Sequence, residues 1–256
     1  MTVMEPEQID LDRYAFRMTI GEGPGGIPLR LKLEESHGVI AAGSDRSELL
    51  RLGSALARSV LRSSGAGSAQ VIWAGRTAPS WIGAEPGTWS EGKSEGIAAA
   101  LEAFRLEQAR RFDVMRSVRS TNLPHYNALA ESSGKPLLPF MLFVLEDLPA
   151  AGSLGLRFLD RLCGAARYGR ACGMLPLVLA TDPTPQALPA RLKAEIQDRV
   201  ALRLPDRRSS VMALMVLGAE SLGPDEALYR NAAGKVPAVR VRIARDNQFS
   251  EDRGTC

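Results

Sequence analysis

Short apolar runs that alternate with helical patterns restrict the fold of this chain more than any other feature of its sequence. Uninterrupted runs of this length are typical of strands that are buried on both faces of a sheet. They occur at Val39–Gly43, Gln70–Trp73, Leu138–Leu145, Leu175–Thr181 and Val200–Leu204. Between them, apolar residues recur three and four positions apart, as on one face of a helix. This alternation predicts an α/β fold with a mostly parallel sheet and helices on both faces.

The N-terminal part of the chain has a different pattern. Two short segments of alternating apolar residues, joined by a glycine-rich turn, predict a β-hairpin over Tyr14–Leu33. The turn matches the dinucleotide-binding pattern G-x-G-x-x-G at Gly21, Gly23 and Gly26. That pattern requires a strand before it and a helix after it. Because a second strand follows here, we interpret the segment as a loop.

The amino-acid composition excludes several classes of protein. Of the 256 residues, 45% are hydrophobic and 24% are charged, with a formal net charge of +3. This balance excludes a disordered polyelectrolyte and the strongly basic profile of many nucleic-acid-binding proteins. We expect a flexible N-terminus at residues 1–13, a single domain at residues 14–245 and a disordered tail at residues 246–256. Because we find no secretory leader and no membrane segment, we predict a cytoplasmic protein.

Two predicted helices carry further signals. Asp45-Arg46-Ser47-Glu48 has the D-x-x-E form of a capping box, which begins a helix. A longer helix follows Ser94, and its polar face carries five arginines: Arg105, Arg110, Arg111, Arg116 and Arg119. We interpret this arginine stripe as a solvated face, with contact to DNA phosphates or to a partner subunit as the alternatives. The chain has two histidines and three cysteines without metal-ligand spacing, so we expect no metal site.

The order and spacing of five further segments carry the strongest functional signal. They are Arg119–Asn127, Phe140–Leu148, Arg167–Gly173 with Leu177–Thr181, Asp206–Gly223 and Ala227–Tyr229. In this order they resemble the FtsK/SpoIIIE and HerA-like motor ATPases, over nearly the whole chain from about residue 20 to residue 245. The resemblance implies a P-loop NTPase fold of the RecA/HerA-like type. It also implies ring assemblies that move DNA with ATP and Mg²⁺.

The chain departs from this family where the phosphate loop should lie. A phosphate loop needs glycines whose backbone N–H groups converge on the phosphates, a lysine for the β- and γ-phosphates, and a hydroxyl for Mg²⁺. In the matching segment, Leu49 and Leu50 occupy the lysine and serine positions. Acidic side chains also stand where the triphosphate would lie. We therefore predict a degenerate nucleotide-binding position formed by Gly43, Ser44, Asp45, Arg46 and Ser47.

Two other site positions also differ. The resemblance places an aspartate for Mg²⁺, followed by a glutamate for the attacking water, at the end of the Walker B strand. This chain has Glu146 and then Asp147, the reverse order. The family glutamine that senses the γ-phosphate is Asp182 here. These carboxylates are our candidate catalytic residues. We expect no cofactor, and ATP with Mg²⁺ only if the site is active after all.

One segment elsewhere matches the Walker A pattern G-x-x-x-x-G-K-[ST] in full. It has Gly87, Gly92, Lys93 and Ser94 at the required positions. The pattern has its mechanical meaning only when a buried strand leads directly into the first glycine. Two prolines and little alternation precede Gly87, so we interpret the string as a capped helix start. Phosphate binding by Lys93 is the alternative.

These observations lead to two function hypotheses of different classes. The first is a catalytically degenerate, FtsK-like structural or regulatory module of a DNA-translocation or related secretion assembly. It predicts a protein partner or a homo- or hetero-oligomer, possible pairing with an active motor, and possible contact with DNA. The alternative is an active, ATP-driven DNA translocase with a non-standard phosphate loop. A third, more remote hypothesis is a domain related to the type VII secretion ATPases, in which degenerate nucleotide sites accompany an active one.

Overall fold

The computed structural model describes residues 10–63, 67–146, 155–181, 183–231 and 237–243. The ten strands of one sheet are β1 (Arg17–Glu22), β2 (Pro28–Lys32), β3 (Val39–Ala42), β4 (Ala69–Ala74), β5 (Thr88–Glu91), β6 (Phe140–Glu146), β7 (Met174–Ala180), β8 (Asp198–Ala201), β9 (Glu226–Asn231) and β10 (Val239–Arg242). The α-helices are α1 (Arg46–Arg62), α2 (Ser94–Ser117), α3 (Leu123–Ser132), α5 (Gly155–Cys172), α6 (Ala190–Glu195) and α7 (Arg207–Leu214). Short 3-10 helices include η1 (Leu11–Tyr14) and η3 (Leu33–Glu35).

The sheet has a parallel part and an antiparallel part. Its order is β2-β1-β10-β9-β8-β3-β7-β6-β4-β5, and the neighbours from β8 to β5 all pair in parallel. The predicted N-terminal hairpin, β1–β2, extends the sheet through β10 and β9, which pair antiparallel. The predicted α/β fold and hairpin are confirmed. Strand β5 at the free edge of the parallel part was not predicted.

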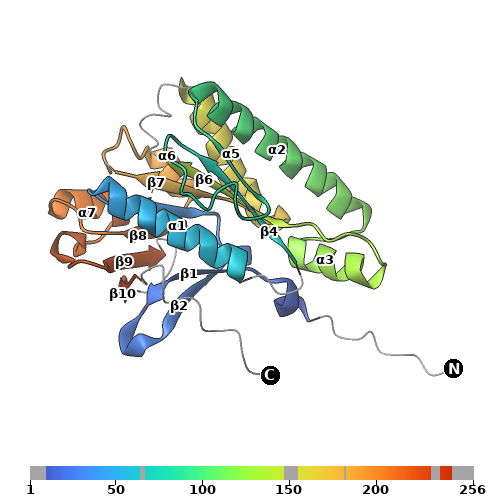
Figure 1. Ribbon diagram of the computed structural model, residues 1–256, viewed down its shortest axis with the longest axis horizontal. Helices are drawn as coiled ribbons and strands as arrows, with labels where there is room; N and C mark the ends of the chain where they lie inside the picture. Colours follow the sequence, from blue (N-terminus) through green and yellow to red (C-terminus); the bar gives the residue numbers. More distant parts are fainter. Residues whose placement is uncertain (1–9, 64–66, 147–154, 182, 232–236, 244–256) are drawn as a thin grey trace.

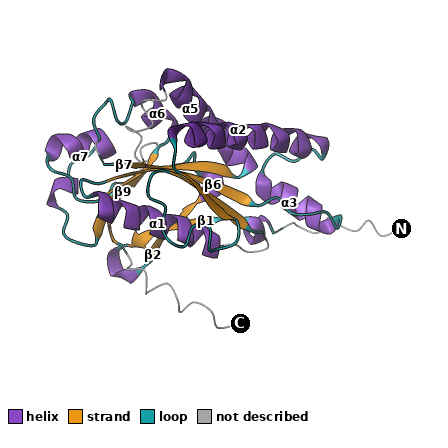
Figure 2. Cartoon of the chain, turned by 45° about the horizontal axis from the view of Figure 1, so that its top comes forward, coloured by secondary structure: helices purple, strands orange, loops and turns teal. Residues whose placement is uncertain are grey.

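Helices cover both faces of the sheet, as expected for buried parallel strands (Figures 1 and 2). Successive residues of each strand enter different cores because strand side chains alternate between faces. Val71 and Leu142 belong to the core under α1 and the hairpin, whereas Ile72 and Phe143 belong to the core under α2 and α5. The apolar runs of the sequence therefore serve two cores at once.

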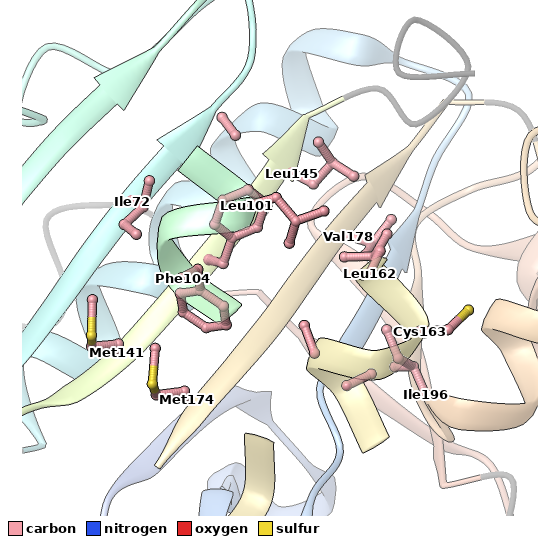
Figure 3. Packing of buried hydrophobic residues seen from close by; sticks show 14 of the residues in the cluster. Ile72, Leu101, Phe104, Met141, Leu145, Leu162, Cys163, Met174, Val178 and Ile196 are labelled. Carbon is pink, nitrogen blue, oxygen red and sulfur yellow. The ribbon is translucent and has the colours of Figure 1, made fainter. Parts of the chain in front are cut away.

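The core under α2 and α5 is drawn in Figure 3. Leu101 and Phe104 from α2 meet Leu162 from α5 above the strand residues Ile72 and Val178. Full burial of a large apolar side chain contributes about 1.5–3 kcal/mol each. Among the described helices, none combines the length and the apolar character that a bilayer-spanning segment requires.

The arginine stripe is not one solvated face. Arg105, Arg110 and Arg116 each form an ion pair with a carboxylate three residues earlier on α2. Arg111 is buried, and its guanidinium donates hydrogen bonds to the backbone carbonyls of Pro139 and Cys172. The helical period explains this correction, because position 111 shares its face with the buried positions 108 and 115. Arg111 thus joins α2 to the amino ends of β6 and β7.

A buried polar network holds the amino end of β8, at the same edge of the parallel strands. Asp198, at the start of β8, is 2% exposed. Its carboxylate accepts hydrogen bonds from the Ser36 hydroxyl (2.7 Å), the Tyr229 hydroxyl (2.6 Å) and the Asn231 amide (2.8 Å). Burial and the neighbouring carboxylate raise the pKa of Tyr229, so its hydroxyl stays protonated and donates. This network joins β8, β9 and the segment that leads into β3.

Candidate functional site

The turn between β3 and α1 is the place where a phosphate loop would lie. The strand ends at Ala42 and the helix begins at Arg46, so only three residues connect them. In the Walker A pattern, the connection from strand to helix contains six residues, counted from the first glycine to the second. The connection here is shorter. Gly43 is buried, and a Cβ there would lie 3.1 Å from Leu202 Cβ. The helix start is therefore close to the sheet.

The polar groups of this turn already have partners within the chain. The Ser44 hydroxyl and backbone N–H donate to the carbonyl of Arg203, at 3.1 and 3.3 Å. The Asp45 carboxylate accepts from the Ser47 hydroxyl and from the backbone N–H groups of Ser47 and Glu48. These hydrogen bonds, first the one from the hydroxyl, lower the pKa of Asp45. The predicted N-cap is confirmed, and it places a negative charge at the helix N-terminus.

The two leucines at the lysine and serine positions lie within α1. Leu49 is 2% exposed and packs in the core under α1, and Leu50 is half-buried against the same core. Neither position points a polar group toward the ends of the strands. Both residues lie within α1, after its first three residues and not in the turn.

The carboxylate of Glu146 is the centre of the candidate site. It lies at the end of β6, and its side chain is 3% exposed. Arg46, the first residue of α1, forms an ion pair with it and also donates to the Thr77 hydroxyl at 3.2 Å. The backbone N–H of Thr77 (3.0 Å) and the indole N–H of Trp73 (3.4 Å) donate to its second oxygen. Two predicted site residues, Arg46 and Glu146, thus meet directly.

No protein-family model matches the chain. By sequence, it is 27% identical over 159 residues to the DNA translocase FtsK of Campylobacter jejuni. The match spans 60% of this chain and only 16% of that protein. The cytoplasmic domain of the type VII secretion ATPase EccC from Thermomonospora curvata has a TM-score of 0.75 and 19% identity, over 94% of this chain and 29% of that one.

A second solved structure, the conjugation coupling protein TcpA of pCW3 with ATPγS, has a TM-score of 0.74 at 15% identity. It covers 94% of this chain and 68% of the TcpA chain. This chain is an FtsK-like domain of the P-loop ATPase fold. In this FtsK-like domain, the buried carboxylate of Glu146 lies at the end of β6, the strand that resembles the Walker B strand. Strand β7 lies between β6 and β3 in the sheet.

Three residues that hold Glu146 were not predicted from the sequence of this FtsK-like domain. Trp73 and Thr77 donate to the carboxylate, and Gly75 lets β4 approach it. A Cβ at Gly75 would lie 2.4 Å from Glu146 Oε2. The only sequence signal is an indole donor followed by a glycine, directly after a predicted buried strand. Two other candidates, Asp147 and Asp182, lie outside the described residues.

The second Walker A string has a different structure from the one we expected. Gly87 adopts a positive φ of 74° before β5, and β5 then occupies Thr88–Glu91, inside the string. Helix α2 begins at Ser94 as predicted, but no side chain caps it at Lys93. The pattern requires the strand before the first glycine, not after it. Four strand spacings, about 19 Å, separate β5 from β3.

The candidate site offers few groups for a metal ion. Among the described residues, no three His, Cys, Asp or Glu side chains lie together in an arrangement that could hold one. Glu146 has its oxygens directed to a guanidinium, a backbone N–H and an indole N–H. In this geometry the carboxylate acts as an acceptor that ties α1 to β4 and β6.

Proposed function

We propose that this FtsK-like domain is a catalytically degenerate ATPase-type domain, a structural or regulatory module of a DNA-translocation or related secretion assembly. One observation carries the proposal: Arg46 from the start of α1 forms an ion pair with Glu146, the carboxylate at the Walker B position. A guanidinium thus takes the place at which a working site would hold Mg²⁺.

The residues at the β3–α1 turn also do not fit a triphosphate. The Asp45 carboxylate occupies the N–H groups of the first turn of α1, which a phosphate would need. Lysine is absent from the segment, and the two leucines in its place belong to helix α1. To bind a triphosphate here, the Asp45 carboxylate would have to release the N–H groups of Ser47 and Glu48, and the Arg46–Glu146 ion pair would have to break.

The assembly part of the proposal rests on the relatives. FtsK is named a DNA translocase, EccC a type VII secretion ATPase and TcpA a conjugation coupling protein. Such a domain can contribute an interface to a homo- or hetero-oligomer without hydrolysing ATP itself. An active FtsK-like motor is the protein partner that we propose first. We also propose a cytoplasmic location, a proposal supported by the EccC structure, which is a cytoplasmic domain.

Nucleotide titration tests the degenerate site. We expect a fluorescent ATP analogue with Mg²⁺ to show no saturable binding to the full chain below about 1 mM. An FtsK motor domain with an intact phosphate loop is the positive control. Micromolar binding, together with ATP hydrolysis that Lys93→Ala abolishes, would contradict the proposal and favour the active translocase.

Titration with duplex DNA distinguishes the two kinds of module. A DNA-handling module would bind duplex DNA with an affinity that falls steeply with salt, because phosphate contacts release counterions. A protein scaffold would show no such dependence, and we expect this second result. Our reason is that Arg105, Arg110 and Arg116 already pair with carboxylates on their own helix.

A further inference from the structure

Residues 207–217, which form α7 and the turn after it, lie at one end of the molecule (Figures 1 and 2). This short segment exposes three large apolar side chains to solvent: Val211 (45% exposed), Met215 (57%) and Leu217 (54%). Large apolar side chains that are exposed elsewhere in the described chain are far apart in sequence. Single exposed apolar residues are ordinary, whereas a group of them on a surface is typical of an interaction site. We call the exposed side of residues 207–217 the α7 surface.

Two further features of the segment oppose its local stability. Met215 ends α7 with a positive φ of 61°, a left-handed conformation that strains any residue with a Cβ and suits glycine. Arg207 and Arg208 occupy the first turn of the helix, where the helix dipole disfavours positive charge. Local rules that a native sequence breaks are expected at functional positions. Here the strained backbone, the unfavourable charges and the exposed apolar side chains all occur within residues 207–217.

Cations from three other elements hold the end of α7 in place. Lys193 of α6, Arg199 of β8 and Arg230 of β9 donate to the carbonyls of Met212 (3.2 Å), Ala213 (3.5 Å) and Leu214 (2.8 Å) in that order. The last carbonyls of a helix have no partner within the helix, and cations suit them because of the helix dipole. Arg199 is 3% exposed, so one of these cations is buried for this contact. The backbone beneath the α7 surface is therefore fixed before any partner binds.

The charges of the α7 surface favour an acidic partner. The side chain of Arg207 is 81% exposed, and its ion pair with Glu220 is long, at 3.8 Å. Arg208 is exposed beside it. The nearby carboxylates of Asp206 and Glu220 each accept a hydrogen bond from a backbone N–H of their own turn, at 2.7 and 2.9 Å. A carboxylate from outside would be attracted by both guanidinium groups and by the N-terminal end of the helix dipole.

We propose that the α7 surface docks an acidic amphipathic helix of a partner protein. Val211 and Met215 are four residues apart, the spacing of a ridge that packs into the groove of a second helix. Leu217 extends this apolar centre, and the carboxylates of the partner pair with Arg207 and Arg208. Methionine and arginine are also enriched at protein–protein interfaces. The proposal does not depend on whether the β3–α1 turn binds ATP.

Fluorescence anisotropy with a designed peptide and the full chain tests the proposal. The labelled probe is an amphipathic helix of about 18 residues, with leucine on one face and glutamate on both sides of that face. A control peptide has lysine in place of each glutamate. We expect the acidic peptide to bind with a Kd below about 200 μM and the lysine peptide to bind at least about tenfold more weakly. No saturable binding of the acidic peptide, or equal affinity for both peptides, would overturn the proposal.

Two variants and two matched controls locate the binding. Leu217→Ser and Arg207→Glu should each weaken binding of the acidic peptide by about tenfold. Because a glutamate suits the first turn of a helix, Arg207→Glu should still fold. The controls are on α2: Leu106→Ser, at a residue that is 64% exposed, and Arg116→Glu, at a side chain that is 80% exposed. Both should leave the affinity unchanged. If Leu217→Ser and Arg207→Glu bind as the parent does, the α7 surface is not the docking site.

Met215→Gly separates docking from folding. Glycine adopts a positive φ without strain, so this variant should melt at the same temperature as the parent or higher. It should nevertheless bind the acidic peptide at least about fivefold more weakly. A lower melting temperature, or unchanged binding, would mean that Met215 is kept for the fold and would contradict the proposal. Sedimentation of the full chain tests the other occupant, because a dimer that Met215→Gly dissociates would assign the α7 surface to a second copy instead.

Discussion

Glu146 and Asp198 are both buried carboxylates at the ends of parallel strands, but their charges are balanced in different ways. Glu146 lies at the carboxyl end of β6 and pairs with Arg46, whose own side chain is 46% exposed. Asp198 lies at the amino end of β8 and accepts three hydrogen bonds from neutral groups. Within the described residues, Asp198 has no ion pair.

The two carboxylates also differ in what holds their partners in place. The donors to Asp198 come from β9 and from the segment before β3, so the sheet itself holds them in place. The cation at Glu146 belongs to a long, half-exposed side chain that reaches across from the first residue of α1. Under the function proposed above, the Arg46 guanidinium takes the place of a metal ion at this carboxylate. The four predictions below test this contrast, from the largest expected effect to the smallest.

Replacing Asp198 should have the largest effect. Asp198→Ala removes the common acceptor and leaves three donors, on the buried Ser36 and the half-buried Tyr229 and Asn231, without this partner. We expect a loss of about 4 kcal/mol in the free energy of unfolding, measured by urea denaturation. Asp113→Ala, on the exposed face of α2, is the control. A loss below about 1 kcal/mol would show that water replaces the hydrogen bonds of Asp198. The proposed difference between Asp198 and Glu146 would then be wrong.

Breaking the pair from the side of Arg46 should cost less. Arg46→Ala leaves Glu146 charged, buried and without a cation, and we expect a loss of about 3 kcal/mol in the same assay. Because Glu146→Gln also removes the charge, the double variant should regain part of this loss. Additive losses in the double-mutant cycle would mean that the two groups are not coupled.

A third carboxylate, Glu107 on α2, has two arginine partners on a half-buried helix face, and they change its pKa. Hydrogen bonds from Arg110, and then those from Arg111, lower the pKa of Glu107 to about 2. A lowered folded-state pKa stabilises the protein above the unfolded value of 4.5, and this contribution is lost as the pH falls toward about 2. Glu107→Gln should therefore flatten the acid limb of the stability profile over that window. A parallel downward shift at every pH would instead indicate lost packing.

Lys93 should matter least. It is exposed at the edge of the sheet, so Lys93→Ala should change the free energy of unfolding by less than about 0.5 kcal/mol. The exposed Lys135→Ala is the matched control. A larger change in the free energy of unfolding, or a change in ATP affinity, would indicate that the functional site lies beside β5 and not beside β3.

Much of the architecture could be predicted from local pattern. The runs that became β3, β6 and β7 are buried on both faces, so they contain almost only apolar residues. Strand β5 was missed because its four residues include one large apolar side chain, Trp89, and its pairing to β4 is not local. Arg111 was placed on a solvated face because an arginine pattern does not reveal which carbonyls lie beyond the helix.

The sequence by itself determined the alternation of strands and helices, the Asp45 cap and the absence of lysine between β3 and the first turn of α1. These features depend on residues that are near one another in the chain. Only the tertiary structure decided that Arg46 and Glu146, one hundred positions apart, meet in one ion pair, and that Trp73 and Thr77 complete it. The physical reason is that parallel strands bring their carboxyl ends to one edge of a sheet, whatever their separation in sequence.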